Sequence, residues 1–498
     1  MTMTQLADDI LSAPQGDNAR PAARRPAAAA VAVAVEGLHD AGASELLPPW
    51  AGTAPAIARV PASPVAAWLK VLVPAAMIAL AAASWLTWDA LVGAVDSFRH
   101  HALGQVFFVG CQVLLAIHIV AFIWRLVLVL RYRPAATCTD AELPACCVVV
   151  PAYNEGRGVY DTLVSLIRSD YPPGKLQIIT VDDGSLDDTW QWMQRAAGEF
   201  PGQILTLRLN HNRGKRHALY EAFRAARADV LVTVDSDCVV APSAIRRLVS
   251  PMVRSADVSA VAGNVRVLNR EAGLLPRMLD VNFAYSFDFM RSSQSEVNTV
   301  MCTPGALAGY RRSVVMGVLQ EWVNQRFCGR AANIGEDRAL TNLILREGHL
   351  CHFQQDAMCY TKVPAGYAGL CRMFLRWARS NVRETIAMGG FLFGRFRRQG
   401  ALGARVNFIT QAIDMIAGPL LLAAAIGTLI WHPGIYSIHI LTGVFIASAV
   451  PAIFYAIRER SSDCLLALPY GVFNLVALSW IGAYSLMTPH KSSWLTRG

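Results

Sequence analysis

The 498-residue sequence lacks several features that would direct its interpretation toward other classes of protein. Its eleven Cys residues form no CxxC pair, so we expect buried, reduced thiols. It contains no Gly-x-Ser-x-Gly nucleophile motif and no internal repeat. Residues 1–65 are rich in Ala, Pro and Arg and carry no apolar core followed by a cleavage site. We therefore expect a disordered cytoplasmic tail there, and not a signal peptide.

The composition is too apolar for an ordinary soluble protein. Hydrophobic residues make up 54% of the chain and the mean hydropathy is +0.34, so membrane spans are expected. The formal net charge of +9 would also suit nucleic-acid binding, but the Arg residues lie beside apolar runs, where membrane proteins collect positive charge. We therefore predict contact with a lipid bilayer and no nucleic-acid partner.

Two apolar runs near the beginning of the chain are long enough to cross a bilayer, which takes about 20 residues. They extend from Ala67 to Val92 and from Leu103 to Trp124. Together they predict a transmembrane hairpin over residues 66–133. Three Arg residues between positions 125 and 133 follow the second run, so the chain is expected to return to the cytoplasm there.

Residues 405–488 predict further transmembrane helices. Their apolar stretches lie near Val406 to Trp431, Ile435 to Ile457 and Cys464 to Met487. We expect three or four carboxyl-terminal spans, although a bend at Pro469 or Gly471 could make the last stretch re-entrant.

Between these membrane segments, residues 143–363 have the composition of a soluble α/β domain. Three apolar runs predict buried strands, at Cys147 to Val150, Gln177 to Val181 and Val230 to Val234. Each run is followed by a polar or acidic loop. Because ligands bind at the carboxyl edge of an open parallel sheet, we expect these loops to form one pocket.

Asp235 and Asp237 follow the third strand at a spacing that suits a divalent cation. Mg²⁺ or Mn²⁺ would be held there together with the oxygens of a diphosphate. Taken alone, an Asp-x-Asp pair is more often a solvated turn, but its position behind two similar loops favours the metal site.

The basic loop from His211 to Arg216 lies between the second and third predicted strands. Gly214 would let the backbone approach a ligand closely. We assign the loop, and with it Lys215, to the phosphates of a nucleotide-sugar donor. A solvated run of surface charge is the alternative.

The order of these motifs resembles that of family 2 glycosyltransferases of the GT-A fold. The motifs are Pro151 to Glu155, Val181 to Ser185, Gly214 to Arg216, Asp235 to Asp237, Gly335 to Arg338 and Arg376-Trp377. The later motifs resemble hyaluronan synthases and the rhizobial nodulation chito-oligosaccharide synthase in particular. The resemblance covers about Leu143 to Gly498. It implies an α/β GT-A domain in the cytosol, inserted between transmembrane helices.

The same resemblance implies roles for the residues of the donor site. Tyr153, Glu155 and Asp183 would contact the uridine of a UDP-sugar. Asp235 would lie near the ribose and diphosphate, and Asp237 would bind the metal ion, with Asp235 as its neighbour.

Asp337 would be the general base of the reaction, again by resemblance. It would remove the proton of the acceptor hydroxyl as that oxygen attacks the sugar carbon from the face opposite UDP, which inverts the anomeric centre. A single displacement needs one carboxylate base and no nucleophile, in agreement with the absent nucleophile motif. An ordinary acidic first turn of a helix is the alternative for Glu336-Asp337, and both can hold.

Residues 364–400 predict amphipathic interfacial helices, because Arg residues recur every three or four positions from 372 to 383. Such a stripe can rest on anionic lipid headgroups. In the resembled family, however, Arg376 would reach the diphosphate and Trp377 would stack on the acceptor sugar.

Acceptor contacts are also implied for Glu336 and Gly305, but the sequence departs from its relatives nearby. Met373 stands where they usually carry Gln, and Ala306 stands where they often carry Pro. The identity of the sugar and the processivity of the enzyme therefore stay open.

Residues 489–498 resemble the Trp-Gly-Thr-Arg gating motif of hyaluronan synthases. By that resemblance Trp494 and Arg497 would close over bound UDP. The motif favours a cytoplasmic tail, whereas three spans after the soluble domain would place the tail outside.

Asp414 lies inside a predicted span together with Asn407 and Gln411. A carboxylate there is costly unless it faces a polar path or a partner. It would either line a polysaccharide tunnel or form a pair buried between helices.

We therefore expect a multi-pass inner-membrane enzyme with a cytoplasmic catalytic domain. It would polymerise sugar from a UDP-sugar, expected to be UDP-N-acetylglucosamine, into a β-linked polysaccharide of hyaluronan or chitin type, and export it. A non-processive transferase with a lipid-linked acceptor is one alternative, and a transporter with a regulatory nucleotide-binding domain is another. Secretion partners and the oligomeric state do not follow from the sequence.

Overall fold

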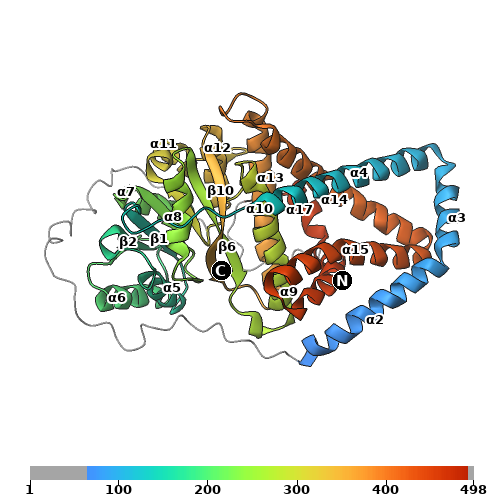
Figure 1. Cartoon of the computed structure of the whole chain (residues 1–498), viewed down its shortest axis with the longest axis horizontal. Helices are drawn as coiled ribbons and strands as arrows, with labels where there is room; N and C mark the ends of the chain where they lie inside the picture. The colour runs from blue at the N-terminus through green and yellow to red at the C-terminus, as the bar shows by residue number, and fades with distance from the viewer. Residues whose placement is uncertain (1–63, 492–498) are drawn as a thin grey trace, which may run out of the picture.

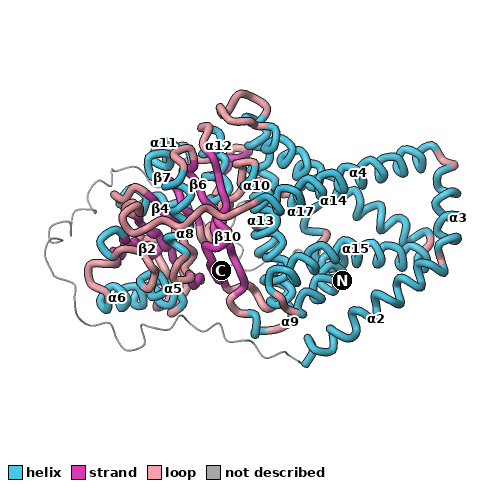
Figure 2. Tube along the Cα trace, in the orientation of Figure 1, coloured by secondary structure: helices cyan, strands magenta, loops and turns pink. Residues whose placement is uncertain are grey.

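A computed structural model of the chain describes residues 64–491 (Figure 1). Most of the predicted tail of residues 1–65 lies outside the described residues, as do Trp494 and Arg497. Strands are confined to one half of the molecule, and the other half is built from long helices (Figure 2).

The α/β half contains an eight-stranded mixed sheet in the order β3-β2-β1-β4-β7-β6-β10-β5. Its strands are β1 (Cys146–Ala152), β2 (Leu176–Asp182), β3 (Ile204–Arg208), β4 (Val230–Thr233), β5 (Cys238–Val240), β6 (Val258–Val267), β7 (Ala308–Arg311) and β10 (Leu350–Thr361). Strands β1 to β4 are parallel to one another. β7 is antiparallel to both β4 and β6, and β5 is antiparallel to β10. A separate hairpin pairs β8 (Arg326–Phe327) with β9 (Arg330–Ala331). The three predicted strands are therefore the parallel β1, β2 and β4.

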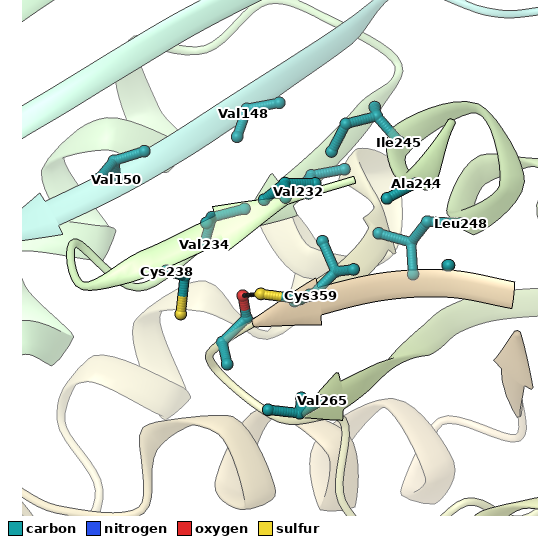
Figure 3. Close-up of a cluster of buried hydrophobic side chains, with 14 of the residues drawn as sticks. Val148, Val150, Val232, Val234, Cys238, Ala244, Ile245, Leu248, Val265 and Cys359 are labelled. Carbon is teal, nitrogen blue, oxygen red and sulfur yellow. Dashed lines mark hydrogen bonds between the residues drawn. The ribbon is translucent and has the colours of Figure 1, made fainter. Parts of the chain in front are cut away.

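Helices cover both faces of the sheet, so β1 is buried along its whole length. Alternate residues of a strand point to opposite faces. Val148 and Val150 accordingly pack toward α5 (Gly158–Ile167), α6 (Thr189–Glu199) and α8 (Ala244–Arg254), in the cluster that Figure 3 shows. Val149 packs toward α7 (Lys215–Ala225), α11 (Arg312–Val323) and α12 (Glu336–Arg346).

Four helices of the described residues are long and apolar enough to cross a membrane. The stretches are Trp68–Leu86 of α2 (Pro64–Leu86), Gly104–Arg131 of α4 (Ala102–Arg131), all of α14 (Leu402–Trp431) and all of α15 (Pro433–Glu459). Large apolar side chains on them, such as Leu86 and Ile430, are 82% and 79% exposed. The predicted first run is interrupted, since α2 ends at Leu86 and α3 (Trp88–Arg99) begins after Thr87.

The last apolar stretch is a bent pair of helices. It contains η4 (Ser462–Leu466), α16 (Ala467–Phe473), the π-helical η5 (Asn474–Leu478) and α17 (Trp480–Met487). The two arms differ in direction by 42° at Ser479, and not at Pro469 or Gly471 as predicted. The Ser479 hydroxyl donates a hydrogen bond to the Leu475 carbonyl (2.6 Å), and such back-bonding bends helices.

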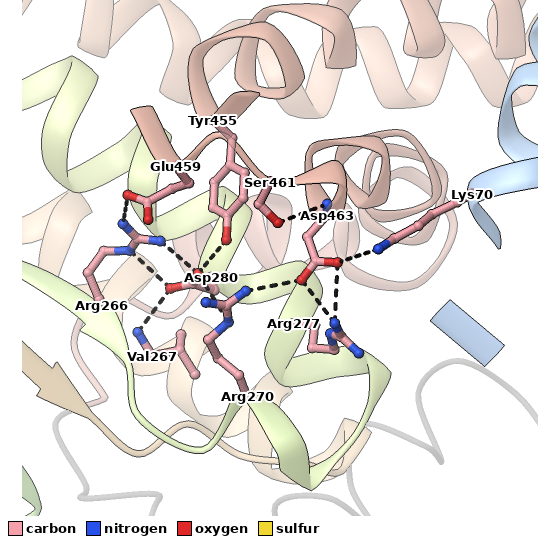
Figure 4. A network of polar contacts seen from close by, with 10 residues as sticks. All are labelled: Lys70, Arg266, Val267, Arg270, Arg277, Asp280, Tyr455, Glu459, Ser461 and Asp463. Atoms are coloured by element: carbon pink, nitrogen blue, oxygen red, sulfur yellow. Dashed lines mark hydrogen bonds and ion pairs between the residues drawn. The ribbon is translucent and has the colours of Figure 1, made fainter. Parts of the chain in front are cut away.

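A charged network, here called the joint, connects the α/β domain to the membrane helices (Figure 4). Asp280 of α9 (Leu274–Phe283) accepts hydrogen bonds from Arg266 of β6 (2.7 Å) and from Tyr455 of α15 (2.8 Å). Asp463 of η4 pairs with Arg277 of α9 (3.1 Å) and with Lys70 of α2 (3.3 Å). Arg270 of η2 (Arg270–Ala272) pairs with both carboxylates. A network of ion pairs therefore connects the membrane helices to the sheet.

Candidate active site

A cavity of about 1250 Å³ opens at the carboxyl end of β1, β2 and β4. It continues from there to α9, α13 (Tyr367–Leu392), η5 and α17. Its lining contains most of the predicted site residues: Tyr153, Asp183, Lys215, Asp235, Asp237, Gly305, Glu336, Asp337, Arg376 and Trp377. Glu155 lies on the loop after β1 but does not line this cavity.

Asp183, which follows β2, holds the basic loop in place through hydrogen bonds. Its two carboxylate oxygens accept the backbone N–H groups of Arg213 and Gly214, both at 2.8 Å. Gly184 permits this close approach, because its φ is +73° and a Cβ there would lie 2.6 Å from the backbone of His211. Burial raises the pKa of Asp183, although the two N–H groups oppose that shift.

The basic loop only partly faces the cavity. Residues 212–215 line it, but Arg216 lies on the other side of α7, since successive residues of a helix point in different directions. Its guanidinium lies over the Trp322 ring and donates to the Trp322 carbonyl (2.7 Å). The assignment of this loop to phosphates therefore does not extend to Arg216, which the sequence pattern alone did not separate from Lys215.

Lys215 connects two carboxylates across the cavity. Its ammonium lies 2.5 Å from Asp235 Oδ1 and 2.8 Å from Glu336 Oε1. Although burial alone would raise the pKa of Glu336, the charge of Lys215 lowers it to about 2. Burial would likewise lower the pKa of Lys215, but the two carboxylates raise it. Lys215 and Glu336 are therefore both ionised near neutral pH.

Asp235 and Asp237 offer hard oxygen ligands on the β4–β5 loop. Thr361 at the end of β10 donates a long hydrogen bond (3.4 Å) to Asp237 Oδ1. Burial, with the neighbouring charge of Asp235, raises the pKa of Asp237 to about 6. Within residues 64–491, no group of three or more His, Cys, Asp or Glu side chains could hold a metal ion. The pair therefore fits a cation that takes its remaining ligands from a diphosphate and water.

Asp337 lies in the first turn of α12, and its carboxylate is fixed by two backbone N–H groups. Arg338 donates to Oδ1 (2.7 Å) and Gly305 donates to Oδ2 (3.2 Å). Burial raises the pKa of Asp337, and the negative charge of Glu336 adds to that rise. The carboxylate is thus positioned to accept a proton from a group in the cavity.

Two glycines let the elements of the site come together. A Cβ at Gly305 would lie 2.5 Å from Lys215 Nζ, so this backbone reaches the ammonium only as glycine. Gly335, with φ of +74°, begins α12, and a Cβ there would lie 1.7 Å from Ser380 Oγ of α13. The helix of Asp337 and the helix of Arg376 and Trp377 therefore meet directly at Gly335.

Aromatic side chains line the cavity where α9 and α13 meet. Trp377 is 39% exposed, and its ring lies 6.0 Å from Phe283 and 5.7 Å from Phe374. Arg376 precedes it on α13 and also lines the cavity. An exposed indole face at this position can stack on the C–H face of a sugar ring.

Arg291 of α10 (Met290–Glu296) is a cation in the cavity lining that no sequence motif predicted. Its guanidinium lies over the Phe287 ring (4.1 Å) and donates to the Cys302 carbonyl (3.1 Å). Burial lowers the pKa of Arg291. Phe287 lies in the π-helical η3 (Ala284–Phe289) just before α10, so no simple helical period marks this face in the sequence.

Comparison with known proteins identifies the family. Residues 144–380 match the model of glycosyltransferase like family 2. An N-acetylglucosaminyltransferase of Mesorhizobium japonicum is 32% identical over 358 residues, which is 71% of this chain and 82% of the relative. The chain is a family 2 glycosyltransferase. This result confirms the enzyme class that the motifs predicted and sets the transporter alternative aside.

Other glycosyltransferases are similar over comparable lengths. A hyaluronan synthase of Streptococcus pyogenes is 30% identical over 359 residues, covering 70% of this chain and 82% of the relative. The fold is shared with a mannosyltransferase of Pyrobaculum calidifontis, solved in complex with GDP-Man and Mn²⁺. That structure has a TM-score of 0.50 and 21% identity, and covers 73% of this chain and 98% of its own. The predicted GT-A fold of this glycosyltransferase is confirmed.

Proposed function

We propose that this glycosyltransferase transfers N-acetylglucosamine from UDP-N-acetylglucosamine, with inversion, to the end of a growing β-linked polysaccharide. One observation carries the proposal: a single cavity is lined by Asp235 and Asp237, by Trp377 and by Asp337 in the first turn of α12. The named relatives, an N-acetylglucosaminyltransferase and a hyaluronan synthase, support the choice of sugar.

Asp337 is the general base of the proposed reaction. Its ionised carboxylate takes the proton of an acceptor hydroxyl while that oxygen forms a bond to the sugar C1 and the bond from C1 to the UDP oxygen breaks. The two backbone N–H groups hold the carboxylate in place during this step. One displacement converts an α-linked donor into a β-linked product.

Donor binding is assigned to the loops after β1, β2 and β4. Tyr153 and Asp183 lie where a uridine would meet the cavity wall, and Lys215 and Arg376 supply positive charge for the diphosphate. Asp235 and Asp237 would hold Mg²⁺ or Mn²⁺, which when bound neutralises charge on the departing UDP. Trp377 provides the stacking platform for the acceptor, with Glu336 and Gly305 beside it.

Export is supported by a polar face on α14. Its side chains are spaced three or four positions apart: Asn407, Thr410, Gln411 and Asp414. Arg338 of the cavity lining donates to Gln411 (3.3 Å), and Asp414 pairs with His118 of α4 (2.7 Å). A polar face in an apolar span is costly unless it meets a polar path, so we assign this face to the product route. The expected alternative is a pair buried between helices. The His118–Asp414 pair does join α4 and α14, but its side chains are 46% and 48% exposed in the structure.

The bent pair of residues 462–487 is assigned a re-entrant course. Asp463 at its beginning contacts α9, and Thr488 after its end accepts a hydrogen bond from Arg379 of α13 (3.1 Å). Both ends therefore contact the catalytic side, while Leu478 and Gly482 between them line the cavity. We infer that this course returns the chain at Thr488 to the side of the catalytic domain, which we propose to be cytoplasmic.

The products of the reaction test this function. Inner membranes that contain the protein are incubated with UDP-N-acetylglucosamine, with or without UDP-glucuronate, and the products are sized. Polymer or an oligomer ladder from the first donor alone indicates a chitin-like product, and a requirement for both donors indicates hyaluronan. A single addition to a lipid-linked acceptor would replace the polymer proposal with the non-processive alternative.

A further inference from the structure

The position of Lys215 resembles that of a bound cation. Its side chain is only 14% exposed and lies between Asp235 on the β4–β5 loop and Glu336 on α12. The ammonium is close enough to Gly305 that a Cβ there would lie 2.5 Å from Nζ. Its ammonium is thus held between two carboxylates at the wall of the cavity.

The carboxylates of the site include two that Lys215 contacts directly. Together with several basic side chains, five carboxylates line the cavity: Asp183, Asp235, Asp237, Glu336 and Asp337. Of these, Asp235 and Glu336 share the ammonium of Lys215 within hydrogen-bond distance. A divalent ion at Asp235 would stand beside that ammonium, and two like charges at such separation repel each other strongly when little water lies between them.

We propose that Lys215 is a resident counterion of Asp235 that competes with the divalent cation, so that metal binds tightly only together with the donor diphosphate. The inference rests on the proposed function, in which Asp235 and Asp237 hold the metal. The diphosphate removes the competition because its oxygens bind the metal ion and the ammonium at once. Glu336 keeps Lys215 within reach of the diphosphate during this exchange.

The test measures Mn²⁺ binding and not turnover. The full-length protein is purified in detergent, and free Mn²⁺ is followed by electron paramagnetic resonance during titration, with and without UDP. The wild-type protein is expected to bind Mn²⁺ weakly alone and tightly with UDP. In Lys215→Met, affinity without UDP should rise about tenfold or more, as expected for removal of a hydrogen-bonded charge, and the effect of UDP should shrink.

Lys362→Met is the matched control. Lys362 is exposed at the rim of the same cavity, and its loss changes the net charge equally without removing a contact to Asp235. Its affinity for Mn²⁺ without UDP should change by less than about threefold, since an exposed charge is screened by water. An equal gain in both variants would overturn the proposal, because a general field effect would then explain it.

A second variant covers the case in which Lys215→Met fails to fold, since that change leaves Glu336 buried without its ammonium. Lys215→Met combined with Glu336→Gln removes both charges and should show the same gain in Mn²⁺ affinity. An unchanged or lower affinity without UDP in the folded variant contradicts the role of Lys215.

Asp237→Ala separates this inference from the proposed function. If it abolishes Mn²⁺ binding in the presence of UDP while the Lys215 variants show no gain, the metal site stands and the counterion role fails. If it leaves UDP-dependent binding intact, the metal assignment fails, and the role of Lys215 with it.

Discussion

Single carboxylates in this cavity differ in their affinity for protons, and the differences follow from their neighbours. Lys215 lowers the pKa of Glu336 to about 2, whereas burial and Asp235 raise that of Asp237 to about 6. Burial and Glu336 also raise the pKa of Asp337. The pKa values of these two adjacent acids on one helix turn therefore differ. Glu336 stays ionised, whereas Asp337 can act as a base that takes up a proton.

The pH dependence of turnover should report this difference. Asp337 acts as a base only when deprotonated, so turnover falls as the pH falls through its pKa. Glu336→Gln removes a negative charge beside Asp337. It also removes the carboxylate that partly neutralises the ammonium of Lys215, and both effects lower the pKa of Asp337. The acid limb of the UDP-release profile is therefore expected at lower pH in Glu336→Gln. Glu347→Gln, at the other end of α12, makes the same charge change and should leave the limb in place. A shift to higher pH would refute this account of the pair.

Gly305→Ala tests the close contact beneath Lys215. The new Cβ would lie 2.5 Å from Nζ, and the flexible lysine end should move away from Asp235 while the fold persists. We expect turnover to drop about ten- to a hundredfold, as for other small displacements of catalytic groups, with little change in melting temperature. Gly317→Ala, on an exposed turn of α11 with nothing within 4 Å, is the control and should keep full activity. Wild-type turnover in Gly305→Ala would show that the position of Lys215 is unimportant.

At the scale of elements, the site depends on how α12 meets α13. Gly335→Ala should disturb both, because its Cβ would lie 1.7 Å from Ser380 Oγ and its φ of +74° strains an L-residue by about 1–2 kcal/mol. We expect a lower melting temperature and nearly complete loss of UDP release. Adding Ser380→Gly removes the obstructing side chain and should restore part of both. Gly366→Ala, at the open beginning of α13, should be almost neutral. Equal damage in the single and double variants would contradict a steric origin.

Elements set by local pattern could be predicted from the sequence. β1, β2 and β4 are continuous apolar runs that end at polar or acidic residues. From those residues the loops that line the cavity next to these strands could be predicted. β7 has only four residues and is ordered by antiparallel pairing with β4 and β6, a long-range contact that local sequence does not specify. The direction of Arg216 likewise depends on where α7 begins, and the inward side of Arg291 depends on a π-helical turn. The roles of all the candidate site residues stay predictions, including those of Glu155, Trp494 and Arg497.

At the scale of the whole molecule, the joint connects the α/β domain to the long apolar helices. Asp280 is 1% exposed and accepts bonds from Arg266 and Tyr455, and Arg266 also pairs with Glu459 at the end of α15. The cavity lining includes residues of α9 and α13 as well as of η5 and α17, so the shape of the cavity depends on how these helices pack together.

Asp280→Asn should weaken this docking. It leaves the buried Arg266 with Glu459 as its remaining charged partner, and breaking a buried ion pair costs up to about 3–5 kcal/mol in the free energy of unfolding. A clear drop in melting temperature of the detergent-solubilised protein is expected, with loss of polymer length before loss of UDP release. The exposed Asp257→Asn is the control and should have little effect. A variant with unchanged melting temperature would show that the joint does not hold the two halves together.

UDP release by purified Asp337→Asn tests the central claim most directly. The amide keeps the shape of the side chain but cannot take the acceptor proton, so turnover of UDP-N-acetylglucosamine should fall by at least about a hundredfold. UDP binding and melting temperature should stay close to those of the wild-type protein. Turnover retained at the wild-type level in this folded variant would contradict the assignment of Asp337 as the base of an inverting transfer.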